Sequence, residues 1–262
     1  MVNIIDYKVD GFQNERNFTQ ELDGKRVRQL KPLYYQMIVQ LYGKVCGLKK
    51  VHAWVDDTKK KYDIVIKIGK VEKKISIKKG INNSMHVEGI STFIHFLIEM
   101  KIGREHVMTY LKYHYADGTT NGKGEYRISV QEYKLLHQEE INQLNTCLNH
   151  PFVLRQAINR FVLMGRNSEE KIDGIIYGVV NDFIFISAQD IIRVIESKKD
   201  ISMTGVHFGP LCCQPMTRNL NYNPLYEKKR FCVQIKWYNI YEDIVDYRRK
   251  KEQSNHEQNK RI

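Results

Sequence analysis

The stretch 62–88, YDIVIKIGKVEKKISIKKGINNSMHVE, constrains the fold of this chain more than any other part of the sequence. Apolar residues alternate with polar ones on both sides of Gly69–Lys70, and such alternation predicts two β-strands that each bury one face. Gly69–Lys70 itself is interpreted as a two-residue hairpin turn. With the turn in this position, the register of the hairpin puts Asp63 directly opposite Ser76.

The two faces of this predicted hairpin differ in chemistry. Successive side chains of a strand point to opposite faces, so Asp63, Ser76 and Lys78 share one face. The other face is apolar and can pack against a helix; it carries Ile64, Ile66, Ile68, Ile75 and Ile77. An acid, a hydroxyl and an amine therefore lie side by side, backed by a hydrophobic core.

The rest of the chain mixes helical and strand patterns. Five segments are expected to be helical: 15–43, 85–100, 129–148, 151–164 and 188–196. Strands are expected within 172–186, 204–213 and 230–238. We therefore expect an α/β fold, in which a mixed central sheet is flanked by helices, and a single domain over residues 1–247.

The composition limits the class of protein. Lys and Arg number 42 against 30 Asp and Glu, a formal net charge of +12, and this excess favours a polyanionic partner, nucleic acid first. No apolar run is long enough for a membrane-spanning helix, and residues 1–10 do not look like a secretory signal. Five cysteines without metal-binding spacing favour a reducing cytoplasm. The basic tail, 248–262, is expected to be disordered, or ordered only on a phosphate backbone.

Asp63, Ser76 and Lys78 together resemble the catalytic motif of the PD-(D/E)xK nuclease superfamily, which has the restriction-endonuclease-like fold. In that motif an Asp begins one strand and an acid-x-Lys follows on the next. Asp63 matches the first acid and Lys78 the lysine, whereas Ser76 stands where the second acid is expected. One subgroup of restriction enzymes has Ser-x-Lys, with the missing acid on the following helix. Glu88 resembles that acid, because the helix expected at 85–100 would hold it in its first turn, although its interval from the lysine is shorter here.

The resemblance implies a metal-dependent hydrolysis of phosphodiester bonds. Asp63, Glu88 and the backbone carbonyl of Ile77 would hold Mg²⁺ or Mn²⁺, which stabilises charge on the phosphate and lowers the pKa of a bound water. Lys78 would orient and help to activate that water, and Ser76 would hold a water or a ligand by hydrogen bonding. Since such folds cut both strands of double-stranded DNA with two active sites, a homodimer is expected.

A second acid-x-Lys, Glu72-Lys73-Lys74, occurs in the same hairpin. Glu72 lies four residues before Ser76, roughly 13 Å along the strand from the point opposite Asp63. Carboxylates that far apart cannot share one Mg²⁺, whose oxygen ligands lie at about 2.1 Å. We therefore reject Glu72 as the second acid, provided that the turn is placed correctly.

Residues suited to phosphate or base contacts gather in two places. Asn83 and His86 follow the hairpin, and the predicted DNA-contacting segment, 204–238, carries Gln214, Arg218, Asn219, Arg230, Gln234 and Lys236. Each has a structural alternative: a helix cap for Asn83, a surface histidine for His86, and a polar loop with an amphipathic strand for 204–238.

The sequence therefore predicts a Mg²⁺-dependent DNA endonuclease of the type II restriction or anti-phage kind. Two alternatives stay open. The missing second-strand acid would also suit a nucleic-acid-binding module that kept the fold and lost the chemistry. An RNA nuclease is the other alternative, because no residue reports on a 2′-hydroxyl.

Overall fold

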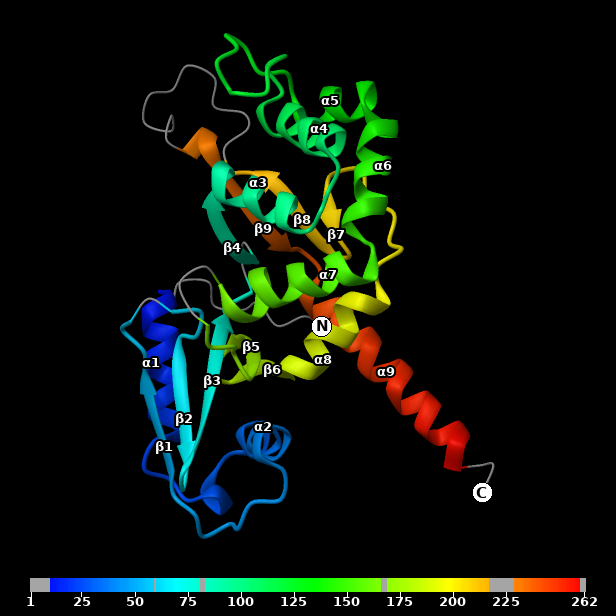
Figure 1. Ribbon diagram of the computed structural model, residues 1–262. Coiled ribbons are helices and arrows are strands. Elements are labelled where there is room, and N and C mark those ends of the chain that lie inside the picture. Colours follow the sequence, from blue (N-terminus) through cyan, green and yellow to red (C-terminus); the bar gives the residue numbers. More distant parts are fainter. Residues whose placement is uncertain (1–9, 59, 81–82, 166–168, 217–228, 260–262) are drawn as a thin grey trace. The chain divides into compact units, whose positions relative to one another are not determined.

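The protein is described from a computed structural model (Figure 1). The structure describes residues 10–58, 60–80, 83–165, 169–216 and 229–259. The chain divides into two compact units: unit 1 comprises Met1–Asn83, Leu163–Val194 and Asn239–Ile262, and unit 2 comprises Ser84–Val162 and Ile195–Tyr238. The single domain expected over residues 1–247 stays a prediction.

Unit 1 is built on a five-stranded mixed sheet with the strand order β1-β2-β3-β5-β6. The strands are β1 (Val51–Val55), β2 (Ile64–Ile68), β3 (Val71–Lys78), β5 (Gly174–Val179) and β6 (Asp182–Ser187). β3 runs parallel to β5, and the other neighbouring pairs are antiparallel. β3 is thus the middle strand, with hydrogen-bonded neighbours on both sides.

The hairpin of β2 and β3 has the register that the sequence predicts. Ile64 pairs with Ile75. Gly69 in the turn has a φ of +64°, a conformation that glycine adopts without strain because it has no Cβ. Continued by one residue, the same register sets Asp63 opposite Ser76. The turn is therefore where the sequence analysis put it, and the rejection of Glu72 stands on that register.

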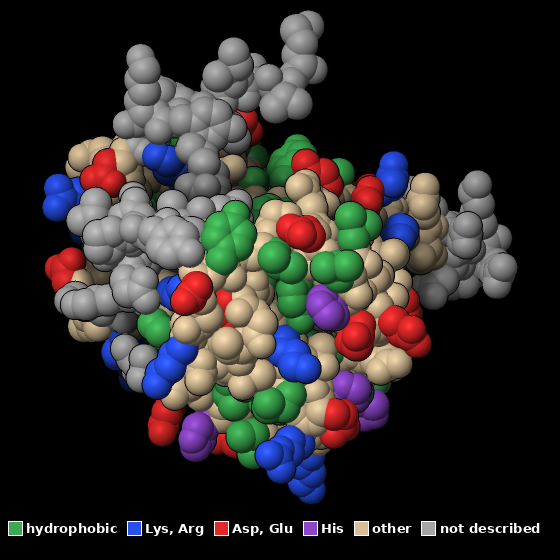
Figure 2. Space-filling view, turned by 90° about the horizontal axis from the view of Figure 1, so that it is seen from above, with side chains coloured by type: hydrophobic (Ala, Val, Ile, Leu, Met, Phe, Trp, Pro, Cys, Tyr) green, Lys and Arg blue, Asp and Glu red, His purple; other side chains and the backbone are tan. Residues whose placement is uncertain are grey.

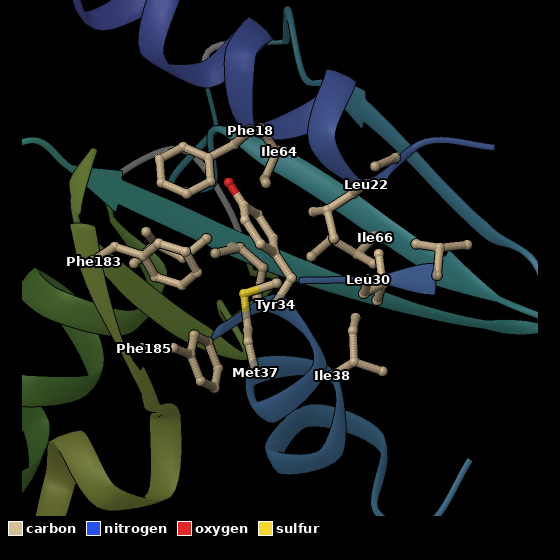
Figure 3. Close-up of a cluster of buried hydrophobic side chains, with 14 of the residues drawn as sticks. Phe18, Leu22, Leu30, Tyr34, Met37, Ile38, Ile64, Ile66, Phe183 and Phe185 are labelled. Carbon is tan, nitrogen blue, oxygen red and sulfur yellow. The ribbon is translucent and has the colours of Figure 1, made fainter. Parts of the chain in front are cut away.

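Two helices, α1 (Gly11–Leu22) and α2 (Pro32–Tyr42), cover the apolar face of this sheet. Phe18 of α1 and Tyr34 of α2 pack with Phe183 of β6 in a cluster of rings whose centroids lie 5.0–6.1 Å apart (Figure 3). The same core contains the apolar hairpin face, Ile64, Ile66, Ile68, Ile75 and Ile77. Because this face is buried, the face that carries Ser76 and Lys78 points away from this core.

The segment 15–43 is two helices and not one continuous helix. A short 3₁₀ helix, η1 (Val27–Gln29), lies between α1 and α2. The chain leaves α1 at Gly24, whose φ is +76°, and Pro32 occupies the first turn of α2, where its missing N–H costs nothing. The two breaks have ordinary sequence causes, a glycine and a proline.

Unit 2 is built on a four-stranded antiparallel sheet with the order β4-β9-β8-β7. Its strands are β4 (Ser84–Gly89), β7 (His207–Phe208), β8 (Leu211–Pro215) and β9 (Cys232–Trp237). Its helices are α3 (Ile90–Glu99), α4 (Arg104–Tyr115), α5 (Val130–Leu136), α6 (Gln138–Leu148) and α7 (Pro151–Ala157), and a π-helical segment, η2 (Ile158–Met164), follows α7. A second aromatic core, Phe93, Phe96, Phe161 and Phe208, lies in this unit.

The prediction that a helix begins at residue 85 is wrong, because residues 84–89 form β4. In this strand the usual pattern is inverted: His86 and Glu88 are buried, while Val87 is 41% exposed. Polar residues inside and an apolar residue outside hide the alternation that identifies a strand. The helix begins only at Ile90, so Glu88 does not lie in its first turn.

The remaining helices follow the predicted segments in part. The segment 129–148 holds α5 and α6, and the Ser129 side chain accepts a hydrogen bond from the backbone N–H of Glu132, the capping interaction of α5. α8 (Ala188–Ser197) matches its prediction. α9 (Ile240–Asn259) continues to Asn259, whereas the sequence predicted disorder from residue 248; Tyr247 and Lys251 contact Asp190 of α8 at 3.2 and 3.5 Å.

No helix among the described residues has both the length and the apolar character that a membrane span requires.

Candidate active site

The carboxylate of Asp63 is held at the middle of the unit 1 sheet. Asp63 directly precedes β2, and its Oδ2 accepts hydrogen bonds from the Ser76 hydroxyl at 3.0 Å and from the Ile77 backbone N–H at 2.5 Å. Both donors are neutral, so the negative charge of Asp63 is fixed in position without being cancelled by them. The side chain stays partly exposed. A fixed carboxylate of this kind can still bind a cation.

Ser76 and Lys78 occupy the same face of β3 as the sequence predicts. Ser76 is only 1% exposed, and Lys78 is partly exposed at the end of the strand. Both residues pair with β5 across a parallel ladder, Ser76 with Ile175 and Lys78 with Tyr177. The backbone at this point is therefore fixed from both sides, by β2 and by β5.

Glu15 of α1 is a candidate site residue that the sequence did not suggest. The pKa of Glu15 is raised to about 7, mainly by burial; the negative charge of Asp63 contributes to the rise, and the positive charge of Lys78 opposes it. Glu15 lies one helical turn before Phe18, which is fully buried in the core. From the sequence, Glu15 could be seen only as an acid next to the apolar face of a predicted helix. Its position beside the hairpin depends on how that helix docks on the sheet.

A second lysine, Lys61, lies beside the same charges. The pKa of Lys61 is lowered to about 7, first by burial and then by the charge of Lys78, while the charge of Asp63 acts in the opposite direction. The stem of Lys61 packs against the backbone of Gly165, where an added Cβ would lie 3.3 Å from the lysine Cδ. Unit 1 thus brings two acids and two amines together at one end of the hairpin.

The donor chemistry of this cluster fits a hard divalent cation. Asp63 and Glu15 are both carboxylates; burial is the main cause of the raised pKa of Glu15, and the negative charge of Asp63 adds to it. Mg²⁺ usually takes one or two carboxylates and completes its shell with carbonyl oxygens, phosphates and waters. Among the residues that the structure describes, no group of three or more His, Cys, Asp or Glu side chains could hold a metal. Two carboxylates with the Ile77 carbonyl therefore match magnesium better than zinc.

Glu88 and His86 lie together in unit 2, on β4, and Glu88 is enclosed by cationic or potentially cationic partners. Its Oε2 lies 3.2 Å from His86 Nε2 and accepts a hydrogen bond from Arg160 Nη2 at 2.8 Å. Burial would raise the pKa of Glu88, but the hydrogen bond from His86 and the charge of Arg160 outweigh it and lower this pKa below its usual value. The negative charge of Glu88 is thus already balanced inside the protein.

The residues predicted to contact DNA have varied surroundings. Arg218 and Asn219 lie outside the described residues, and Asn83 directly precedes β4, with a φ of +27°, so it does not cap a helix. On the face that Figure 2 shows, Lys and Arg side chains are interspersed with acidic and apolar ones and form no single basic patch. The net charge of the chain therefore does not by itself locate a nucleic-acid surface on this face.

Three predicted contact residues belong to the polar face of the unit 2 sheet. Gln214 and Gln234 are directly opposite each other on β8 and β9. Gln234 donates to Ser84 Oγ at 3.1 Å, and Gln214 accepts from Tyr238 at 2.8 Å. Lys236, the third, lies over the Tyr238 ring, 5.5 Å from its centroid. These side chains share one partly exposed strip of amide, hydroxyl and amine groups.

Arg230 lies in a turn before β9 and is engaged within unit 2. Its Nη2 lies 2.5 Å from Asp117 Oδ2 and donates to the carbonyl of Gly124 at 3.1 Å. Asp117 also accepts hydrogen bonds from the backbone and hydroxyl of Thr119. Arg230 therefore fixes the loop that begins at Asp117, and its role in DNA binding stays a prediction.

The mixed five-stranded sheet flanked by helices is a restriction-endonuclease-like α/β fold, as the sequence predicts. Among solved structures, the crystal structure of restriction endonuclease MspI in complex with its cognate DNA is similar to this chain, with a TM-score of 0.55. The match covers 86% of this chain and 91% of that chain, at 13% sequence identity. No family model matches the sequence, and no curated protein matches it significantly. This similarity shows the fold, and the assignment of an activity depends on the site.

Proposed function

We propose that this protein is a Mg²⁺-dependent DNA endonuclease, of the type II restriction or anti-phage kind. The observation that carries this proposal is Asp63, held by Ser76 and Ile77 at the middle of the sheet, within range of the charges of Glu15 and Lys78. The similarity of the fold to that of restriction endonuclease MspI supports a nuclease. The MspI structure contains its cognate DNA, which supports DNA as the substrate.

The metal would be held by Asp63, by the backbone carbonyl of Ile77 and by one further acid. The sequence motif proposes Glu88 for that acid, whereas the charges around Asp63 favour Glu15. A bound Mg²⁺ supplies charge stabilisation for the phosphate and a water of lowered pKa. Mn²⁺ is expected to substitute for it, because it accepts the same oxygen ligands.

The protein groups supply orientation and charge. The Ser76 hydroxyl and the Ile77 N–H keep the Asp63 carboxylate fixed, so little reorganisation is needed when the phosphate arrives. Lys78 would orient the attacking water. Hydrolysis forms a bond from the water oxygen to phosphorus and breaks the bond to the leaving sugar oxygen; the water loses a proton and the leaving oxygen gains one. A phosphate contact by His86 stays a prediction from the sequence, because the side chain is buried against Glu88.

The assembly and location of the enzyme are also proposals. A homodimer is expected because cutting both strands of double-stranded DNA normally uses two active sites. Five free cysteines suit a reducing cytoplasm.

Plasmid cleavage in Mg²⁺, in Mn²⁺ and in EDTA tests this function. Asp63→Asn removes the charge that holds the cation, and Lys78→Ala removes the ammonium; each is expected to slow cleavage by about 10³-fold or more. Glu72→Gln and Lys67→Ala are matched controls. These two residues form an exposed ion pair, with 2.8 Å between Lys67 Nζ and Glu72 Oε1, at the far end of the same hairpin. Cleavage that persists in both site variants, or that needs no metal, would remove the assignment.

One observation favours a second candidate, a nucleic-acid-binding module without catalysis. Ser76 cannot ligate Mg²⁺ as a carboxylate does, and the described residues lack a three-ligand group. Such a module would bind DNA in a salt-dependent manner and hydrolyse nothing with any divalent metal. A parallel panel with single-stranded RNA and double-stranded RNA separates both candidates from an RNA nuclease.

A further inference from the structure

Three donors of unit 1, two of them in the hairpin or directly before it, converge on one carboxylate, that of Glu170. Lys74 Nζ lies 2.8 Å from Glu170 Oε1, and Lys60 Nζ lies 3.0 Å from Glu170 Oε2. The Tyr62 hydroxyl donates to the same Oε2 at 3.1 Å. Both ammonium groups also lie over the Tyr62 ring, 5.5 and 5.6 Å from its centroid. Two cations and a hydroxyl therefore form a compact site for an anion.

This cluster is continuous with the candidate active site. Tyr62 directly precedes Asp63 in the sequence, and Lys74 lies two residues before Ser76, on the same face of β3. Two residues of a strand span about 7 Å. That step is comparable with the separation of neighbouring phosphates along one nucleic-acid strand. The backbone of Lys74 therefore lies about one phosphate spacing along β3 from that of Ser76, whose hydroxyl binds Asp63.

Glu170 occupies this anion site, and its segment has a further anchor on β3. That anchor is Asp173, whose Oδ2 accepts from the Lys74 backbone N–H at 2.8 Å and whose Oδ1 pairs with Lys73 Nζ at 2.8 Å. The Asp173 N–H in turn donates to the Lys74 carbonyl at 2.7 Å. The Glu170 side chain is 42% exposed, so it can turn out to solvent while Asp173 stays in place.

We propose that Lys60, Tyr62 and Lys74 form a second phosphate-binding site, next to the scissile phosphate, and that Glu170 occupies it until nucleic acid displaces it. This inference rests on the proposed function, since it takes the substrate to be a nucleic-acid strand that passes Asp63. It has a specific consequence: removing the Glu170 charge removes a competitor of the phosphate. The variant is expected to bind DNA more tightly than the native protein.

The structural alternative is that Glu170 merely stabilises the fold through two surface ion pairs. Such pairs contribute little, and their loss would lower the melting temperature without any gain in DNA affinity. The two accounts therefore predict opposite outcomes for affinity. Because the Glu170 side chain is 42% exposed and Asp173 is untouched, Glu170→Gln is expected to fold normally.

The test is DNA affinity measured in EDTA, by fluorescence anisotropy of a labelled duplex over a range of salt concentrations. Glu170→Gln is expected to tighten binding about threefold or more, and to steepen the dependence on salt by up to about one released counterion. Lys74→Gln, made in the Glu170→Gln background, is expected to abolish that gain. Glu72→Gln is the matched control: it removes the same charge from an exposed ion pair with Lys67 in the same hairpin, and is expected to change affinity by about twofold or less.

The outcomes separate this inference from the proposed function. Equal effects of Glu170→Gln and Glu72→Gln would overturn the second phosphate site, and so would an absence of DNA binding by every variant. Plasmid cleavage in Mg²⁺ is measured on the same proteins. Cleavage with no specific gain from Glu170→Gln leaves the nuclease and removes the second site, whereas a specific gain without cleavage leaves the second site and removes the nuclease.

Discussion

Asp63 in unit 1 is partly exposed and Glu88 in unit 2 is buried, and the two carboxylates have different hydrogen-bond partners. Asp63 accepts hydrogen bonds from a hydroxyl and a backbone amide, both neutral. Glu88 is 3% exposed and bound by Arg160 and His86. A carboxylate fixed by neutral donors keeps its charge for an incoming cation, whereas one paired with a guanidinium has already used it.

The second acid of the site therefore need not be the one nearest in the motif. Burial raises the pKa of Glu15, and the negative charge of Asp63 adds to that rise. Glu88 has a lowered pKa, because its partners favour the charged form. We therefore propose that Glu15 helps to hold the metal and that Glu88 stabilises unit 2, and variants at these two positions can test this division.

The largest of these effects is expected for Glu15→Gln. If Glu15 helps to hold the metal, the variant is expected to lower Mg²⁺-dependent cleavage by about 10²-fold and to weaken Mn²⁺ binding measured by titration. Glu21→Gln is the matched control, since Glu21 lies on the same helix and pairs with Lys25 and Lys31 away from Asp63. Equal activity of the two variants would return the role of second acid to Glu88.

An intermediate effect, on stability, is expected for Glu88→Gln. The variant leaves Arg160 without its buried partner, which is expected to cost about 2 kcal/mol of unfolding free energy. The cost is below that of a wholly buried pair because the Arg160 side chain is 26% exposed. Urea unfolding measures the loss, and Glu99→Gln on α3 serves as an exposed control. An unchanged stability together with lost Mn²⁺ binding would contradict the division.

The smallest effect is a pH dependence of stability in EDTA. The folded pKa of Glu15 is about 7, above the value of 4.5 for an unperturbed glutamate. Its contribution to stability is therefore fully present below pH 4.5 and is lost as the pH rises through 7. Relative to Glu15→Gln, the native protein is expected to lose on the order of 1 kcal/mol across that window, allowing for solvent screening. Parallel stability curves for the two proteins would show that burial and Asp63 do not act on Glu15.

The hairpin could be predicted from sequence because its information is local. A glycine in the turn and an unbroken alternation fix the register, and the register alone puts Asp63 beside Ser76. The fold class followed from the same mixture of strand and helix patterns. These features depend on residues close together in the chain, where steric and hydrophobic rules act directly.

Two parts of the site could not be predicted, for different physical reasons. Glu88 was assigned to a helix because β4 buries polar residues and exposes Val87, the reverse of the pattern that identifies a strand. Glu15 was missed because its place depends on how α1 docks on the sheet, through Phe18 and Leu22. No local pattern records that long-range packing, although it decides which acid lies beside Asp63.

The most direct test of the central claim is a crystal structure of the protein soaked with Mn²⁺, with the ion located by its anomalous scattering. The account predicts a peak bonded to an Asp63 carboxylate oxygen at about 2.1–2.2 Å, with Glu15 contributing to the same shell. A peak bonded to Glu88 without Glu15, or an empty Asp63 at saturating Mn²⁺, would contradict it.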